Sequence, residues 1–105
     1  MGQNGSQRKD QLGTMSQTKR FVVRFTGRVQ GVGFRATCKM ESSGLSINGF
    51  VKNEVDGSVT LDIDATAADG NELIRRIKIA RSNYVDKVSV DECDSQNRTD
   101  GFHIL

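Results

Sequence analysis

The chain has 105 residues, a formal net charge of +2, two cysteines and no proline, and this length fits one small domain and excludes a large two-domain enzyme. Its 15 lysines and arginines are spread along the sequence with no basic block longer than a pair, so nucleic acid is not an expected partner. No apolar run approaches the roughly 18 residues that a membrane span requires, and no signal-peptide core is present, so we expect a soluble, cytoplasmic protein without membrane contact.

The first predicted element of structure follows a polar tail. Residues 1–18 are rich in Gln, Asn, Ser and Gly, and such a segment cannot bury enough apolar surface to offset the entropy of ordering it. We expect a disordered tail there and a domain over residues 19–105. Phe21–Thr26 is apolar almost throughout and rich in β-branched and aromatic residues, which predicts a central strand that ends at Gly27.

A short helix is predicted next, from Phe34 to about Ser43. Gly44 follows at a position where glycine commonly ends a helix. Three- and four-residue spacing turns one set of side chains to the same side: Phe34, Cys38 and either Met40 or Leu45. Neither Cys38 nor Cys93 has the spacing of a metal site or a redox pair, so both are interpreted as reduced thiols that serve packing.

Two strands joined by a tight turn follow this helix. Ile47–Asn53 and Ser58–Asp64 flank the sequence Glu54-Val55-Asp56-Gly57, and its Asp-Gly pair is a strong signal for a β-hairpin. Apolar and polar residues alternate in the second of these strands, with Val59, Leu61 and Ile63 against Thr60, Asp62 and Asp64. We therefore expect one face of the sheet to be buried and the other to face solvent.

The rest of the chain predicts a helix and two more strands. The helix starts at Gly70 or Asn71, Val85–Val90 supplies the next strand, and Phe102–Leu105 adds a short edge strand. The expected inward residues are Leu73, Ile74, Ile77, Ala80, Val88 and Val90. The order βαββαβ predicts an α+β, ferredoxin-like two-layer sandwich, in which an antiparallel sheet carries both helices on one face. The short last strand offers no large interface, so we expect a monomer.

The segment between the first strand and the first helix carries the clearest functional signal, Val29-Gln30-Gly31-Val32-Gly33-Phe34-Arg35-Ala36. A glycine-rich turn from strand to helix points several backbone N–H groups at one place, and the unpaired amides and dipole of the helix add positive potential there. Arg35, in the first helical turn, adds a planar fork of donors that suits a phosphate or a carboxylate. The pattern predicts an anion pocket whose ligand is a phosphoryl group.

The predicted topology brings a second side chain to this pocket. The first and second strands run parallel with the third between them, so both end at the same edge of the sheet. Asn53 closes the second strand. Side chains of a strand alternate between its two faces, so Asn53 lies on the same face as Ile47, Gly49 and Val51, which must include the buried residues. Its side chain is therefore expected on the helix-covered side, beside Arg35. The same position is also typical of an ordinary hairpin residue.

Together these motifs resemble the acylphosphatase family. The similar segments are Gly27–Arg35, Gly49–Asn53 and Asp56–Val59, and the similarity covers roughly Phe21 to Val90. The resemblance implies hydrolysis of the carboxyl–phosphate bond in small acyl phosphates, which gives a carboxylate and inorganic phosphate without a metal or another cofactor. Such a substrate has an activated leaving group, so the protein need only position the reactants and stabilise charge.

Carried over residue by residue, the resemblance assigns phosphate binding to Arg35 and positioning of the attacking water to Asn53. Backbone N–H groups complete the cradle, from Gln30, Gly31, Val32, Gly33, Phe34 and Arg35. We expect the Gln30 side chain to shape the loop and Phe34 to anchor it in the core. Neither motif contains His, Glu or Cys, so the water's proton is expected to pass to a phosphate oxygen of the substrate.

Other functions fit parts of the pattern. Gly31–Ala36 formally matches the relaxed dinucleotide fingerprint G-x-G-x-x-A, but a hairpin follows the first helix where that fold needs a crossover. No Gly-Lys-Ser/Thr follows the glycines, which excludes a nucleotide-triphosphate loop. An RNA-recognition module shares the βαββαβ order, but Asp62 and Asp64 would repel a phosphate backbone. A non-catalytic domain that senses anions through the same cradle stays open.

Overall fold

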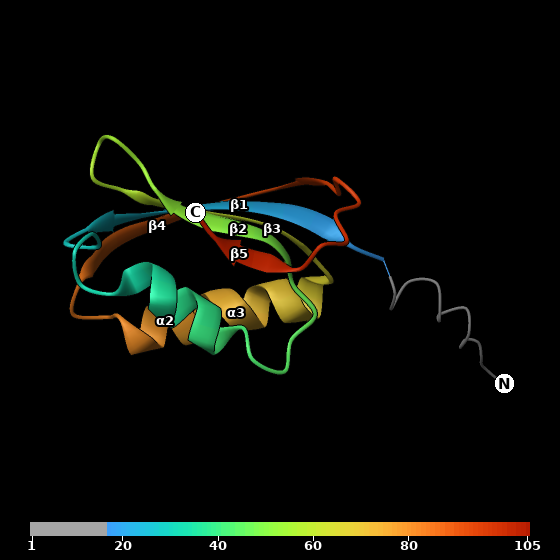
Figure 1. Ribbon diagram of the computed structural model, residues 1–105, viewed down its shortest axis with the longest axis horizontal. Helices are drawn as coiled ribbons and strands as arrows, with labels where there is room; N and C mark the ends of the chain where they lie inside the picture. The colour runs from blue at the N-terminus through green and yellow to red at the C-terminus, as the bar shows by residue number, and fades with distance from the viewer. Residues whose placement is uncertain (1–16) are drawn as a thin grey trace, which may run out of the picture.

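A five-stranded sheet and two helices make up the part of the chain that the computed structural model describes, residues 17–105 (Figure 1). In chain order the elements are β1 (Lys19–Gly27), α2 (Phe34–Glu41), β2 (Asn48–Asn53), β3 (Val59–Ala65), α3 (Ala67–Ala80), β4 (Val85–Asp94) and β5 (Phe102–Ile104). Of the tail expected over residues 1–18, residues 1–16 lie outside the described range. Thr18 Oγ1 donates a hydrogen bond to Ser95 Oγ at 3.1 Å.

The strand order is β4-β1-β3-β2-β5. β3 pairs antiparallel with both β1 and β2, and β4 pairs antiparallel with β1, while β5 runs parallel to β2. β1 and β2 therefore run parallel with β3 between them, and the segments that follow them leave the sheet at the same edge. Both helices cover one face of the sheet (Figure 1). The predicted ferredoxin-like sandwich is confirmed.

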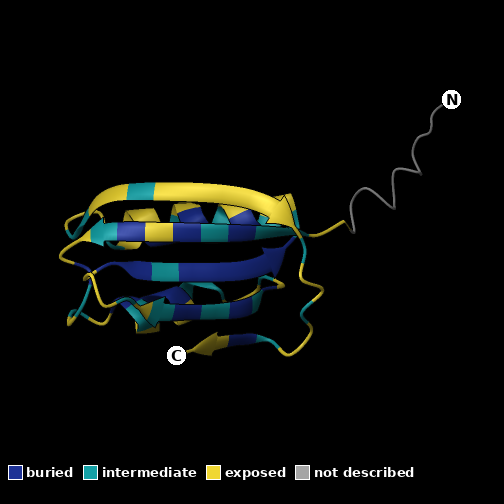
Figure 2. Ribbon diagram, turned by 90° about the horizontal axis from the view of Figure 1, so that it is seen from above, coloured by how far each residue is buried: buried dark blue, intermediate teal, exposed yellow. Residues whose placement is uncertain are grey.

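The core lies between that face and the helices. Alternate residues of β1 and β3 are fully or almost fully buried, and residues of the helices and of β2 meet them, as the dark blue bands of Figure 2 show. The side chains of this core are Phe21, Val23, Phe25, Val29, Phe34, Cys38, Ile47, Val51, Val59, Leu61, Ile63, Ala65, Leu73, Ile74, Ile77 and Phe102. Burial of this apolar surface is the main driving force for the fold.

α2 has eight residues, too few for a helix that is stable by itself. Tertiary contacts hold it: Phe34 and Cys38 are buried, and Arg76 Nη1 of α3 donates to the carbonyls of Glu41 and Ser43 at 2.8 and 3.0 Å. These bonds satisfy carbonyl groups at a helix end where the helix provides no partner. Of the two residues proposed for the inner face, Leu45 packs against the core, whereas Met40 is 70% exposed.

The predicted start of the second helix, at Gly70 or Asn71, is wrong. α3 begins at Ala67, and the N-cap Thr66 accepts a hydrogen bond through Oγ1 from the backbone N–H of Asp69 at 3.2 Å. Gly70 lies inside the helix. The position requires glycine because a Cβ there would collide with the ring of Phe21. This glycine permits close packing of the helix on β1 and does not mark a boundary.

Three burial predictions are also wrong. Ala80, expected on the inner face of the second helix, is exposed at the end of α3. Asp62 and Asp64, expected to face solvent, are 6% and 3% exposed, because arginines and the segment that leads to β5 cover them. Val90, expected to point inward, is 44% exposed. It lies on β4, which forms an edge of the sheet and is exposed along most of its length (Figure 2).

Candidate active site

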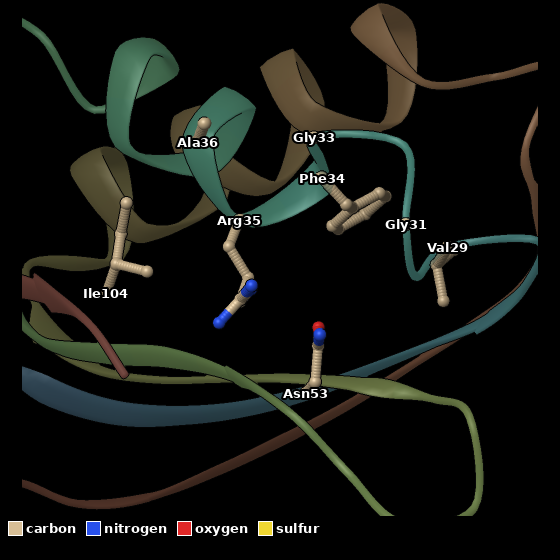
Figure 3. A pocket seen from close by; sticks show the side chains of 8 residues that line it. All are labelled: Val29, Gly31, Gly33, Phe34, Arg35, Ala36, Asn53 and Ile104. Atoms are coloured by element: carbon tan, nitrogen blue, oxygen red, sulfur yellow. The ribbon is translucent and has the colours of Figure 1, made fainter.

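A small cavity of about 190 Å³ opens where β1 and β2 end, between the sheet and the start of α2. Its lining residues are Val29, Gly31, Gly33, Phe34, Arg35, Ala36, Asn53 and Ile104, drawn in Figure 3. The volume is below the ~300–1,000 Å³ of typical ligand pockets, so only a small group fits. Of the residues 17–105 that line it, Arg35 alone carries a charged side chain.

The loop that forms one wall depends on two glycines. Gly31 and Gly33 have φ angles of +76° and +77°, in the left-handed region that side chains with a Cβ disfavour. Gly33 is also the N-cap of α2, where no side chain caps the helix and the first turn holds no acidic residue. The first amides of the helix have no partner within the helix, so they can donate to a bound anion.

Phe34 fixes this loop to the core. Its side chain is 2% exposed, and its ring centroid lies 5.0 Å from that of Phe25 in a tilted arrangement. Val29, on the strand side of the loop, is fully buried. The loop is thus anchored at both ends by buried apolar side chains, as expected for Phe34.

Gln30 connects the loop to the hairpin that carries Asn53. Its Nε2 donates to the carbonyl oxygens of Glu54 and Ser58 at 2.7 and 2.8 Å. Both N–H groups of the side-chain amide donate to the backbone of the hairpin turn. The Gln30 side chain therefore holds together two segments that are distant in the sequence. This agrees with the expected role of Gln30 in shaping the loop.

Arg35 lies in the first turn of α2 and is half-buried. Its Nη1 donates to the main-chain oxygen of Leu105 at 2.7 Å, and Figure 3 shows the guanidinium extending into the cavity toward the side chain of Asn53. Among residues 17–105, no aspartate or glutamate side chain forms a salt bridge with Arg35. Donors of this guanidinium therefore remain available to an anion in the cavity.

Asn53 is the last residue of β2 and pairs with Val59 of β3. Its side chain is exposed and points to the cavity from below Arg35 (Figure 3). The structure therefore brings together the two side chains that the sequence analysis singled out. Their separate roles in binding and catalysis stay predictions.

The turn after Asn53 is held by its own polar groups. The backbone N–H of Glu54 donates to the carbonyl of Ser58 at 2.8 Å, and Asp56 Oδ1 accepts from the hydroxyl and the N–H of Ser58 at 2.6 and 3.0 Å. These hydrogen bonds from Ser58, assisted by Arg24, lower the pKa of Asp56 below its ordinary value. The turn is thus stable at neutral pH and gives Asn53 a fixed base.

Three residues of the site region were missed by sequence reasoning. Arg81, just after α3, donates through Nε to Thr37 Oγ1 at 3.0 Å, and Thr37 Oγ1 donates to the carbonyl of Gly33 at 3.1 Å. This chain supports the loop from behind. Ile104 lines the cavity because β5 runs parallel to β2 and ends at the same edge of the sheet. Such long-range contacts leave no local signal in the sequence.

Neither His103 nor Cys38 is among the residues that line the cavity. His103 lies on β5, is exposed, and places Nε2 2.7 Å from the carbonyl of Asp100. Burial raises the pKa of the Cys38 thiol to about 12, so this cysteine stays protonated. Within residues 17–105, no group of three or more His, Cys, Asp or Glu side chains could hold a metal ion. No helix in that range is long and apolar enough to cross a membrane.

Comparison with known proteins decides the family. The acylphosphatase family model matches residues 21–104. The chain belongs to the acylphosphatase family. An acylphosphatase of Salinibacter ruber is 38% identical over 87 residues, which cover 82% of this chain and 92% of that protein. One from Paenarthrobacter aurescens is 34% identical, with coverage of 85% and 96%.

The solved structures agree with this assignment to the acylphosphatase family. The crystal structure of acylphosphatase from Bacillus subtilis superposes with a TM-score of 0.74 at 29% identity, covering 83% of this chain and 98% of that one. The resemblance to this family that the sequence motifs indicate is thereby confirmed, together with the ferredoxin-like fold.

Proposed function

We propose that this chain is a metal-independent acylphosphatase that hydrolyses the carboxyl–phosphate bond of small acyl phosphates. The observation that carries the proposal is the meeting of Arg35 and Asn53 at a small cavity walled by the glycine loop. Membership of the acylphosphatase family supports the same reaction. The products are a carboxylate and inorganic phosphate.

In the binding step, the phosphoryl group lies against the loop. Backbone N–H groups of residues 30–35 and the N-terminal end of α2 donate to its oxygens. Arg35 binds the same group with the donors that Leu105 does not use, and its planar fork matches the geometry of a phosphate. Both contributions grow as negative charge spreads over the equatorial oxygens in the transition state.

In the reaction step, Asn53 orients a water molecule for in-line attack on phosphorus. The water oxygen forms a bond to phosphorus while the bond to the acyl oxygen breaks, and the carboxylate leaves with the electron pair. A carboxylate is a good leaving group, so the reaction needs no general acid. The side-chain amide of Asn53 can both donate to and accept from the water, which fixes its direction.

The proton of the water goes to a non-bridging oxygen of the transferred phosphate. Among the described residues that line the cavity, none is a carboxylate, thiol or imidazole that could act as a base. Transfer to the substrate completes the reaction without one. We therefore expect the pH profile to follow the ionisation of the substrate rather than that of His103.

The experiment that tests this function is hydrolysis of benzoyl phosphate by the purified protein in the presence of EDTA. We expect turnover that is unchanged by the chelator and competitively inhibited by inorganic phosphate. A domain that only senses anions shares the cradle, and it would bind phosphate in calorimetry yet leave benzoyl phosphate intact above the background rate. That result would reject the enzymatic proposal.

A further inference from the structure

The segment that joins β4 to β5, residues 95–101, is anchored by buried carboxylates on the face of the sheet opposite the helices. β4 and β5 lie at opposite edges of the sheet, so this segment carries the chain from one edge to the other (Figure 2). Asp64 accepts the backbone N–H groups of Gln96 and Arg98, both at 3.0 Å. The carboxylate of Asp64 is almost completely buried. A buried charge of this kind is stable only while its partners stay in place.

Arg98 completes this anchor. Its Nε donates to Asp64 at 3.0 Å, and its Nη2 donates to Asp62 at 2.8 Å. The guanidinium also lies over the ring of Phe50 on β2, 5.8 Å from the centroid. The largest single effect on the pKa of both aspartates is burial, which acts to raise it. Hydrogen bonds from the arginines and from the backbone of the segment together outweigh burial, so the pKa of each aspartate lies below its ordinary value. Arg98 therefore joins the segment to β2 and β3 together.

From this anchor the chain leads directly into β5. Asn48 Oδ1 accepts the N–H of Gly101 at 2.8 Å, and the carbonyl of Gly101 accepts the N–H of Gly49 at 2.9 Å. β5 has three residues and, in the described part of the chain, pairs only with β2, so its ladder alone is weak. Its position depends on how firmly the residues at its two ends are held.

The other end of β5 contacts the candidate active site. The N–H of Leu105 donates to the carbonyl of Val51 at 2.9 Å, and the oxygen of Leu105 accepts from Arg35 Nη1 at 2.7 Å. Ile104 of the same strand lines the cavity. One corner of the Arg35 guanidinium is thus fixed by the residue that directly follows β5, and the group extends into the cavity (Figure 3).

We propose that Arg98 is a positioning residue for Arg35, acting from the opposite face of the sheet through β5. While Arg98 is held by Asp62 and Asp64, β5 stays docked on β2 and keeps Arg35 in the orientation that binds a phosphoryl group. Loss of Arg98 lets β5 detach part of the time, and Arg35 then samples other rotamers. β5, docked or detached, is the two-state element that couples the two sites. This inference rests on the proposed binding of phosphate by Arg35.

The chain offers a matched control in Arg20. Arg20 of β1 also pairs with Asp62, through Nε at 3.0 Å and Nη2 at 2.8 Å, with similar partial exposure of its side chain. Its partner lies within the sheet, and Arg20 donates no hydrogen bond to the segment that leads to β5. Arg20→Gln therefore weakens the same charge cluster without releasing that segment.

The experiment compares Arg98→Gln, Arg20→Gln and the unmodified protein in three measurements. These are the Kd of inorganic phosphate by calorimetry, the Tm, and hydrogen–deuterium exchange of the amides of residues 101–105. We expect both variants to lower the Tm. Only Arg98→Gln should raise the phosphate Kd, by about fivefold or more, and speed exchange in β5, while Arg20→Gln keeps the Kd within about twofold. In kinetics, the Arg98 variant should raise KM more than it lowers kcat.

Two outcomes would overturn the inference. One is an Arg98→Gln protein that binds phosphate normally, and the other is an equal loss of phosphate affinity in both variants. If Arg98→Gln does not fold, Asn48→Ala tests the same path, because it removes the acceptor of the Gly101 N–H. Failure of the proposed enzymatic function can be told apart from failure of this inference. In that case the unmodified protein would not hydrolyse benzoyl phosphate, whereas its phosphate affinity and its amide exchange could still be compared with those of the variants.

Discussion

Arg35 and Arg98 occupy opposite faces of one sheet, and their surroundings differ in kind. Arg98 donates to two buried carboxylates, lies over an aromatic ring, and its own N–H group is bound as well. Among the described residues, Arg35 has one acceptor, the main-chain oxygen of Leu105, and it otherwise extends into an open cavity. The two groups carry the same charge, but among the described residues only Arg98 is paired with aspartate side chains.

This difference separates an arginine that supports the structure from one that is available to a ligand. A guanidinium has five N–H donors, and donors that the protein leaves unused can bind an anion. Charge neutralisation by Asp62 and Asp64 would make Arg98 a poor phosphate ligand. Among residues 17–105, no aspartate or glutamate side chain pairs with Arg35, and this leaves donors of its guanidinium open to the cavity on the helix-covered face.

Replacing Arg35 tests this contrast with the largest expected effect. Arg35→Lys keeps the charge but loses the planar fork, so we expect kcat/KM for benzoyl phosphate to fall by about 10³-fold and phosphate affinity to fall with it. Steady-state kinetics and phosphate calorimetry measure both. Arg75→Lys, on the exposed face of α3, is the control and should keep normal activity. Normal phosphate binding by the Arg35 variant would contradict the assignment.

Asn53→Ala separates catalysis from binding. We expect kcat to fall by about 10²-fold because the attacking water loses its orientation, while the Kd of phosphate changes little. The same two assays apply, and Asn83→Ala in an exposed loop controls for loss of an amide. Undiminished turnover would remove Asn53 from the mechanism and leave it as a hairpin residue.

Gln30→Leu tests the connection between the loop and the hairpin. The carbonyls of Glu54 and Ser58 lose their side-chain donor, which we expect to destabilise the fold by about 1–3 kcal/mol. Loop displacement should lower kcat/KM by about tenfold. Urea unfolding and kinetics measure these effects, with Gln96→Leu as the control, since the Gln96 interaction uses its backbone N–H. Equal behaviour of the two variants would show that the Gln30 bridge is dispensable.

The cluster around Asp64, on the face of the sheet opposite the helices, should make the stability of the protein depend on acid. The pKa of Asp64 is lowered on folding, so its carboxylate stabilises the protein above the unfolded value of about 4 and that stabilisation is lost as pH falls through the folded pKa. Urea unfolding between neutral pH and about pH 2 should give a shallower acid dependence for Asp64→Asn than for the unmodified protein. Asp91→Asn, exposed on β4, should keep the original slope. Parallel curves for all three proteins would contradict this.

Thiol modification should have the smallest effect on activity. Cys93 is exposed and should react with iodoacetamide in the folded protein, whereas Cys38 is buried with a pKa near 12 and should react only after unfolding. Mass spectrometry locates the label, and the denatured protein serves as the positive control. We expect the labelled protein to retain its activity, because neither thiol lines the cavity. Inactivation upon labelling of Cys93 would disagree with that expectation.

Local signals in the sequence were sufficient for much of the fold and for the candidate site. Apolar periodicity and the Asp-Gly turn predict the order of strands and helices, and that order fixes the relative direction of the first two strands. Glycines before Arg35 indicate an anion loop because few other residues adopt the left-handed backbone found at Gly31 and Gly33. Because the first two strands run parallel, Arg35 and Asn53, which follow or end them, are placed at the same edge of the sheet.

The remaining features depend on contacts between residues distant in sequence. The start of α3 was misplaced because the role of Gly70 is decided by Phe21, a neighbour only in the folded chain. The burial of Asp62 and Asp64 was missed because alternation along β3 does not show that Arg98 covers that face. The local backbone preference of a residue depends on its neighbours in the sequence, whereas burial and charge pairing are properties of the packed chain. The sequence by itself therefore determined the loop, the hairpin and the order of elements, and the tertiary structure decided which charges are neutralised and which stay open to a ligand.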